Sequence, residues 1–251
     1  MFTSTNLLIG VIAALIIGLS KTAVPGGGLL ATPLFAMVVS GRLIAGVMLP
    51  VLIVADLFAM RWYRGNRRSE ILKPLVVPVA VGFAGGTLFY VIVGSGGRIL
   101  DVSIGLIVML MVVLQVMRMV RRTPPTDATP VVTNTVGVVG GFTTFVANAA
   151  GPVLNTYFTG LGLPKEPLIG TSSVFYFSVN LAKVPVYALL GFIGGPFFTA
   201  SSLGFDAALL PAVLAGVYGG RWILPRIPQR VFTLVVLVLA FIAALKLLAG
   251  V

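Results

Sequence analysis

The sequence Ser20-Lys21-Thr22-Ala23-Val24-Pro25-Gly26-Gly27-Gly28-Leu29-Leu30-Ala31-Thr32 interrupts an apolar segment that runs from Leu7 to Val39. Proline lacks a backbone donor and glycine favours non-helical dihedral angles, so this stretch predicts a break in a helix. Inside a bilayer, broken backbone is stable only where protein or a watery cavity satisfies its polar groups. In transporters such breaks mark binding sites, because the following half-helix points its positive N-terminal end at an anion. The alternative is a surface loop between two short helices, which the apolar flanks disfavour.

The composition is that of a polytopic membrane protein. Of the 251 residues, 58% are hydrophobic and only 9% are charged, which is too little charge for the surface of a soluble domain. The chain has no cysteine, no histidine and six acidic residues, which removes disulfides, the usual soft metal ligands and the commonest general base. We therefore expect no enzyme, no metal and no cofactor. The net charge of +11 comes from short basic loops between apolar runs, a topology signal rather than a nucleic-acid footprint.

The remaining chain contains a second broken segment and six uninterrupted spans. The second break, Asn148-Ala149-Ala150-Gly151-Pro152, lies at the centre of the apolar run Val131–Leu161. A mostly uncharged loop is expected at Gly191–Phe205. The expected spans are Leu43–Met60, Leu75–Val93, Ile99–Met117, Leu168–Leu190, Ala207–Leu224 and Val231–Leu248.

The order of these features indicates an internal repeat. A first membrane repeat at 1–122 is followed by a cytoplasmic proline-rich linker at 123–130 and a second membrane repeat at 131–251. Each half has a glycine triplet that is spaced to let another helix approach closely. The matched positions are Gly18 with Gly141, Pro25 with Asn148, Gly28 with Gly151, Asp56 with Asn180, and Gly82, Gly85 and Gly86 with Gly216, Gly219 and Gly220.

The placement of basic loops predicts the topology. If each broken segment is a hairpin of two half-helices that returns to its side of entry, the basic loops share one face, as positive-inside membrane topology requires. These loops are Arg61–Lys73, Arg118–Arg122, Lys165 and Arg221–Arg230. Three crossings per half then invert the second repeat relative to the first. We expect an all-α polytopic membrane protein of two inverted repeats, each a re-entrant broken-helix hairpin plus three transmembrane helices, with both termini periplasmic.

These motifs together resemble the sulfite exporter and toluene-sulfonate uptake permeases, the TauE/SafE family. The resemblance lies in the sequence from Gly18 to Gly28 followed by Pro33, in its echo from Gly141 to Pro152, in Gly170-Thr171-Ser172-Ser173, and in both glycine triplets. It covers essentially the whole chain. It implies transport of sulfur oxyanions, such as sulfite or an organosulfonate, across a bacterial inner membrane. Ala149 and Ala150 stand where the family pattern expects glycine, which leaves open which half contributes more to the site.

Two intramembrane lysines are the leading anion-binding candidates. A cation inside the membrane is costly, so Lys21 should face a cavity and meet an anion, unless it reaches out to the interface. Lys183 is the second candidate. It can instead form a structural pair with Asp56, and the two are also the candidates for coupling transport to a proton or another cation.

Neutral donors to the substrate are expected around the two breaks. Most hydroxyls in membrane helices bond their own backbone, so these candidates are stronger as a cluster than singly. The candidates are Thr22, Pro25, Gly26, Gly27, Gly28, Thr144, Asn148, Asn155, Ser172 and Ser173. Arg61 with Trp62, and Arg221 with Trp222, are typical membrane-edge anchors.

The function hypothesis is a secondary transporter that works by alternating access, with the two hairpin tips meeting near the bilayer centre. Export is the expected direction, although the resemblance does not fix it. Rival interpretations are an anion channel, a transporter of another small organic anion, and a lipid-binding or assembly subunit. The sequence leaves open the substrate, the direction, the coupling ion and whether the protein forms a homodimer.

Overall fold

A computed structural model describes residues 2–23, 31–39, 41–94, 97–120, 127–223 and 229–249. This described part is helical and contains no strand. Seven of its helical segments are long and apolar enough to cross a membrane, which confirms the expected all-α polytopic membrane protein. The elements are α1 Ser4–Ala23, α2 Ala31–Ala36, α3 Arg42–Trp62, η2 Arg64–Asn66, α4 Ser69–Leu72, η3 Lys73–Leu75, α5 Val76–Val93, α6 Arg98–Val120, α7 Pro130–Ala147, α8 Gly151–Gly160, α9 Lys165–Gly194, α10 Ala200–Ile223 and α11 Gln229–Ala249.

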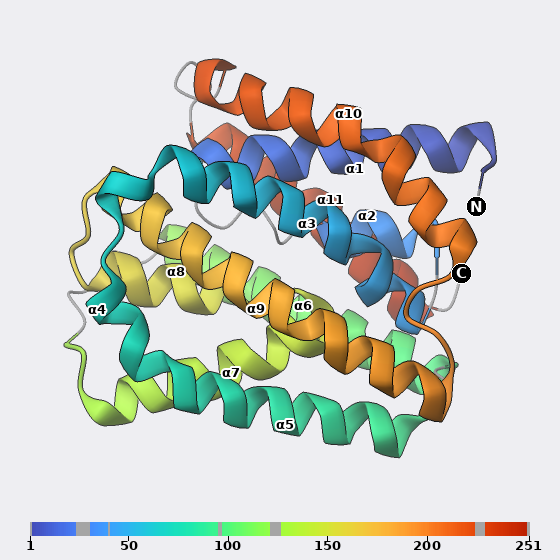
Figure 1. The fold of residues 1–251 in the computed structure, drawn as a ribbon, viewed down its shortest axis with the longest axis horizontal. Coiled ribbons are helices and arrows are strands. Elements are labelled where there is room, and N and C mark those ends of the chain that lie inside the picture. Colours follow the sequence, from blue (N-terminus) through green and yellow to red (C-terminus); the bar gives the residue numbers. More distant parts are fainter. Residues whose placement is uncertain are drawn as a thin grey trace.

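The long helices run between two ends of one bundle (Figure 1). Helix α1 begins and α11 ends at one of them, which we call the termini end. Helix α4 and the start of α7 lie at the other, which we call the α4 end. Helix α3 begins at the termini end and α9 begins at the α4 end. Each broken pair, α1–α2 and α7–α8, thus returns the chain to the end where the pair began.

Two expectations about helix lengths were wrong. The first arm of each broken segment is not a half-helix, because α1 has 20 residues and α7 has 18, each the length of a full span. Only the second arms are short, with six residues in α2 and ten in α8. The loop expected at Gly191–Phe205 is mostly helical, since α9 runs to Gly194 and α10 starts at Ala200. Reciprocal hydrogen bonds between Thr199 and Ser202 cap that start.

Glycines hold the two halves together at two matched contacts. Helix α1 packs on α10 and α5 packs on α7. A Cβ at Gly18 would lie 2.4 Å from the Val213 carbonyl oxygen of α10. A Cβ at its matched position, Gly141, would lie 2.5 Å from the Val79 carbonyl oxygen of α5. Both contacts require glycine, so the expected packing role of the triplets is confirmed at Gly82, Gly86, Gly216 and Gly220, where a Cβ would also clash.

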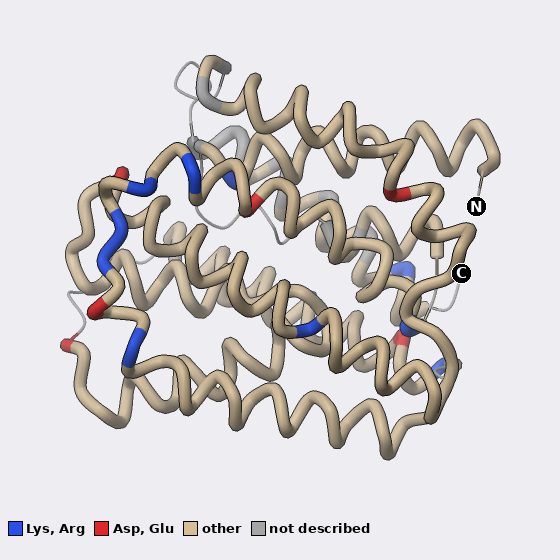
Figure 2. The backbone as a smooth tube through the Cα atoms, viewed as in Figure 1, with Lys and Arg blue, Asp and Glu red and all other residues tan. Residues whose placement is uncertain are grey.

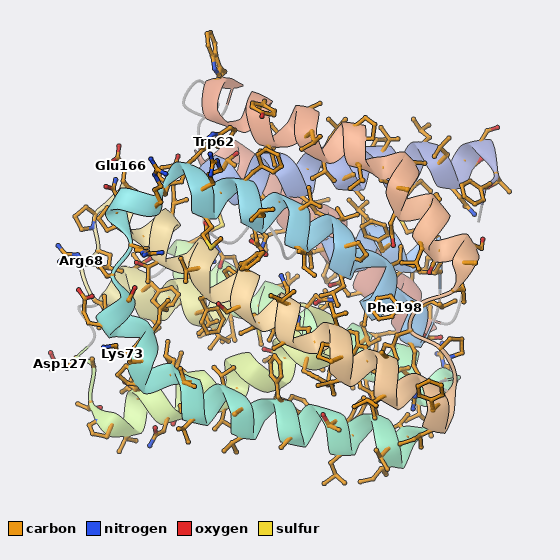
Figure 3. All side chains as sticks on the ribbon, viewed as in Figure 1. Trp62, Arg68, Lys73, Asp127, Glu166 and Phe198 are labelled. Carbon is orange, nitrogen blue, oxygen red and sulfur yellow. The ribbon has the colours of Figure 1, made fainter. Side chains whose placement is uncertain are left out.

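Many of the charged residues lie at the α4 end (Figure 2). The exposed basic residues there begin in the last turn of α3, and Figure 3 shows Arg68 and Lys73 among them together with Asp127 and Glu166. At the termini end, the side chains of Arg42 and Arg98 are hydrogen-bonded to helix carbonyls. The exposed basic residues of the α4 end are Arg61, Arg64, Arg67, Arg68 and Lys73.

Candidate functional site

The second break is a helix end buried inside the bundle. Helix α7 ends at Ala147, and Asn148 adopts the left-handed conformation with φ of 50°, a role more often taken by glycine. The amides of Asn148 and Ala149 bond the carbonyls of Thr144 and Thr143. The carbonyls of residues 145–147 cannot bond within the helix and instead accept from the hydroxyls of Tyr187, Tyr90 and Thr32, in that order. Every carbonyl of the last turn is therefore satisfied, which allows the helix to end away from water.

One of these hydrogen bonds brings the two breaks together. Thr32 is the second residue of α2, which follows the first break, and its hydroxyl bonds the carbonyl of Ala147 just before the second break. The chain from Val24 to Leu30, which includes the candidates Pro25, Gly26, Gly27 and Gly28, lies outside the described residues.

A chain of buried polar side chains crosses the bundle beside the breaks. Lys21, in the last turn of α1, forms an ion pair with Asp56 of α3 at 2.7 Å between Nζ and Oδ1. The Lys21 ammonium also lies 4.3 Å from the ring centre of Tyr176. The other Asp56 oxygen accepts a 2.8 Å hydrogen bond from the Asn180 amide of α9. Asp56 and Asn180, matched between the halves by sequence, thus touch directly.

Lys183 continues this chain toward the second break. Its ammonium donates to Thr144 Oγ1 at 2.9 Å, Asn148 Oδ1 at 2.7 Å and Asn180 Oδ1 at 2.9 Å. Three neutral acceptors match the three donors of a charged ammonium. The side chain is fully buried, and no carboxylate of the described residues pairs with it. We call these six residues the polar chain: Lys21, Asp56, Asn180, Lys183, Thr144 and Asn148.

The structure thereby corrects one pairing. The sequence left open a direct pair between Lys183 and Asp56, but Lys21 is the lysine that pairs with Asp56. Lys183 reaches that carboxylate only through Asn180, since Asn180 accepts from Lys183 and donates to Asp56. Lys21 is only 11% exposed, so it does not extend to an interface.

With both lysines protonated, the polar chain has one more positive charge than negative. Its charged members are two lysines and one aspartate, all inside membrane-length helices. Uncompensated charge is costly in a low-dielectric interior, so the arrangement favours the entry of one anion.

Four other predicted donors lie outside the polar chain. The Thr22 hydroxyl bonds backbone carbonyls of Gly18 and Val217, and Ser173 bonds the carbonyl of Ile169, as expected for hydroxyls in membrane helices. Ser172 and Asn155 are buried, and their side-chain polar atoms have no hydrogen-bond partner within the described residues. These two remain available to a ligand, but they are not joined to the polar chain.

Sequence analysis missed Asn180 and Tyr176 as site residues. Asn180 connects Lys183 to Asp56, which pairs with Lys21. Its position in the second half matches that of Asp56 in the first, and this match could have identified it from the sequence. Tyr176 gave no such signal, because its role depends on the rotation of α9 toward α1.

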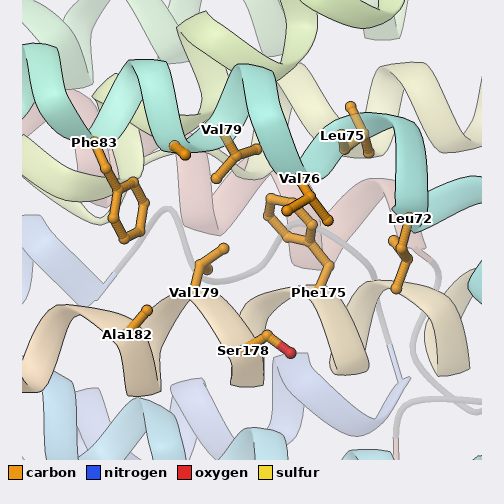
Figure 4. A pocket seen from close by; sticks show the side chains of 10 residues that line it. Leu72, Leu75, Val76, Val79, Phe83, Phe175, Ser178, Val179 and Ala182 are labelled. Atoms are coloured by element: carbon orange, nitrogen blue, oxygen red, sulfur yellow. The ribbon is translucent and has the colours of Figure 1, made fainter.

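An apolar cavity lies apart from the polar chain. It lies between α5 and α9, has a volume of about 260 Å³ and is lined by nine apolar side chains and Ser178 (Figure 4). No member of the polar chain lines it. Such a surface can hold hydrocarbon, but it offers no donor set for an anion.

A family model described as "Sulfite exporter TauE/SafE" matches residues 10–247 of this chain. Comparison with curated proteins and with solved structures found no match.

Proposed function

Because the chain belongs to the sulfite exporter TauE/SafE family, we propose that it is a secondary transporter which moves a small sulfur-containing oxyanion by alternating access. Its role as a membrane transport protein, and not an enzyme, follows from the family and the seven apolar helices. Sulfite and organosulfonates are the proposed substrates, and export is the proposed direction.

The observation that carries this proposal is the buried lysine of the polar chain beside the second helix break. Lys183 is fully buried, and its hydrogen-bond partners among the described residues are all neutral oxygens. A single negative charge placed near Lys183 would balance the two lysines against Asp56. An oxyanion suits this site because its oxygens can accept from an ammonium and from amide N–H groups at the same time.

Asn148 is the member of the polar chain best placed to respond to the substrate. It is half-buried, and its amide nitrogen is held loosely, at 3.4 Å from the Ala45 carbonyl oxygen. An anion could accept hydrogen bonds from this amide and from the Lys183 ammonium, and few of the existing hydrogen bonds would have to break. The backbone N–H groups of Gly26, Gly27 and Gly28 stay candidate donors from the first break.

The packing of the two halves supports alternating access between inverted repeats. Helix α1 packs on α10 and its match α7 packs on α5, while the matched pairs α3–α9 and α6–α11 pack on each other. The two hairpins open toward opposite ends of the bundle (Figure 1). A two-fold relation of this kind lets one half rock against the other around a shared site. The basic α4 end is proposed to face the cytoplasm, with both termini in the periplasm.

Counterflow tests the proposal. Purified protein in liposomes loaded with unlabelled sulfite should accumulate radiolabelled sulfite transiently, because a carrier exchanges its substrate. Lys183→Gln, which keeps an amide donor but removes the charge, should lower the counterflow rate at least tenfold. Lys73→Gln, an exposed control in η3, should match wild type. A linear, non-saturating flux without counterflow would indicate a channel and contradict the proposal.

A further inference from the structure

Asp206 is a buried carboxyl of α10 that takes no part in the polar chain. It is 2% exposed and lies within the membrane-length segment Ala200–Gly220. Neither of its carboxyl oxygens has a hydrogen-bond partner among the described residues, and no ion pair includes it there. We propose that Asp206 binds the proton that is coupled to anion transport. This inference rests on the proposed function and adds the coupling ion and its site.

The two intramembrane carboxyls differ in their surroundings. Asp56 is held by Lys21 and Asn180, so its negative charge is balanced and hydrogen-bonded. Asp206 has no such support, and an isolated carboxylate in an apolar interior is far more costly than the neutral acid. A carboxyl that changes charge during a cycle must be able to lose its partners, so Asp206 suits this role better than Asp56 or Lys183.

No charged side chain of the described residues pairs with Asp206. The helices that pack on α10 are α1 and α3, and their ionisable side chains are all engaged or remote. Lys21 and Asp56 pair with each other, while Arg61 is exposed at the α4 end. Arg42 is bonded to the carbonyls of Gly94, Leu190 and Tyr90. The other ionisable residues of α10 itself are Tyr218 and Arg221, twelve and fifteen positions farther along the helix.

The surroundings fit a proton better than a metal cation. A sodium ion would need several oxygen ligands, and no polar side chain of the described residues is hydrogen-bonded to Asp206. Ser202, one turn earlier, directs its hydroxyl to the Thr199 carbonyl instead. A proton needs only the carboxyl itself.

A backbone defect lies next to this carboxyl. Pro211 is inside α10 and has no N–H, so the carbonyl of Ala207 lacks its helical donor. Helix α10 bends along its length (Figure 1). Ala207 directly follows Asp206 in the chain, and a carbonyl without its helical donor can accept a hydrogen bond from a water molecule that carries a proton.

Asp206 lies closer to the termini end of the bundle than Asp56 does. It follows the start of α10 by six residues, which is about 9 Å along the helix. Asp56 follows the start of α3, at the same end, by fourteen residues, which is about 21 Å. A proton entering from the termini end would therefore reach Asp206 before the polar chain.

The experiment uses the full-length protein and the variant Asp206→Asn, with Asp127→Asn as a control that removes an exposed carboxylate. Infrared spectra of the purified proteins should show a protonated-carboxyl band in wild type and in the control, and no such band in Asp206→Asn. In liposomes, Asp206→Asn should keep sulfite counterflow within about twofold of wild type, because exchange needs no net proton movement. It should lose sulfite accumulation driven by a pH gradient, which wild type and the control should show.

Some results would contradict the role of Asp206 and leave the proposed function standing. One is intact counterflow together with unchanged pH-driven accumulation in Asp206→Asn, and another is wild-type accumulation that responds to a sodium gradient and not to a pH gradient. An infrared band that persists in Asp206→Asn would also count against it. Absence of counterflow in wild type would overturn the proposed function, and the coupling role with it.

Discussion

Removing Lys21 should destabilise the protein far more than removing a surface cation. Its partner Asp56 is fully buried, and the ion pair spans 2.7 Å. Breaking a buried pair by deleting one partner costs about 3–5 kcal/mol, because the other charge stays buried without compensation. In Lys21→Met, Asp56 keeps only the hydrogen bond from Asn180. At about 2–4 °C per kcal/mol for a protein of this size, the melting temperature should fall by roughly 6–20 °C.

The assay is thermal unfolding of detergent-purified variants, followed by intrinsic fluorescence. The control is Arg68→Met, because the ion pair of Arg68 with Glu70 spans 3.6 Å and both side chains are more than half exposed. Such a pair contributes about 0–1 kcal/mol. The double variant Lys21→Met/Asp56→Leu should be at least as stable as either single variant, since it leaves no unpaired charge. Equal melting shifts for Lys21→Met and Arg68→Met would refute the buried pair.

Two further predictions follow from the packing and the break. Gly82→Ala should cost about 1–3 kcal/mol, because its Cβ would lie 2.3 Å from the Val138 carbonyl oxygen. Gly85→Ala on the same helix, with its nearest atom at 3.6 Å, should be neutral or slightly stabilising in the same melts. Equal losses in both would contradict the close helix contact. Asn148→Gly should be less destabilised than Asn148→Ala, because glycine accepts a φ of 50°, although both lose the oxygen that accepts from Lys183, and it should lower sulfite counterflow. Asn148→Ala should lose both stability and transport. Transport at the wild-type rate by Asn148→Gly would show that the Asn148 side chain does not bind the substrate.

Helix breaks and close glycine contacts could be predicted from the sequence because each has a local chemical cause. The Asn148–Pro152 run predicted the end of α7, because several helix-disfavouring residues follow one another there, and the matched glycines mark close contacts that the structure contains. A single proline, as at Pro211, does not end a helix in this structure. How far each arm extends was not predictable from the breaks. A break fixes where α1 ends, at Ala23, but all the apolar residues before it remain free to continue the helix. The start of α10 was missed because Ser201, Ser202 and Asp206 look like loop residues, whereas Thr199 and Ser202 cap a helix.

Most members of the polar chain were predicted, but their connections were not. Intramembrane lysines and asparagines stand out in an apolar sequence, so Lys21, Lys183, Thr144, Asn148 and Asp56 were identified by type and position. Which lysine meets Asp56 depends on how α1, α3 and α9 are rotated about their axes. That rotation depends on packing over the whole bundle, so the sequence around each residue does not predict it.

The central claim is that the buried positive charge around Lys183 binds a sulfur oxyanion. The most direct measurement is the thermal stability of purified wild type and Lys183→Gln across sulfite, thiosulfate, sulfoacetate, taurine, acetate and chloride. A ligand at one hundred times its dissociation constant stabilises the folded protein by about 2.7 kcal/mol. One or two sulfur oxyanions should therefore raise the melting temperature of wild type and leave Lys183→Gln unchanged. A flat response across the anions, or an equal rise in Lys183→Gln, would contradict the claim.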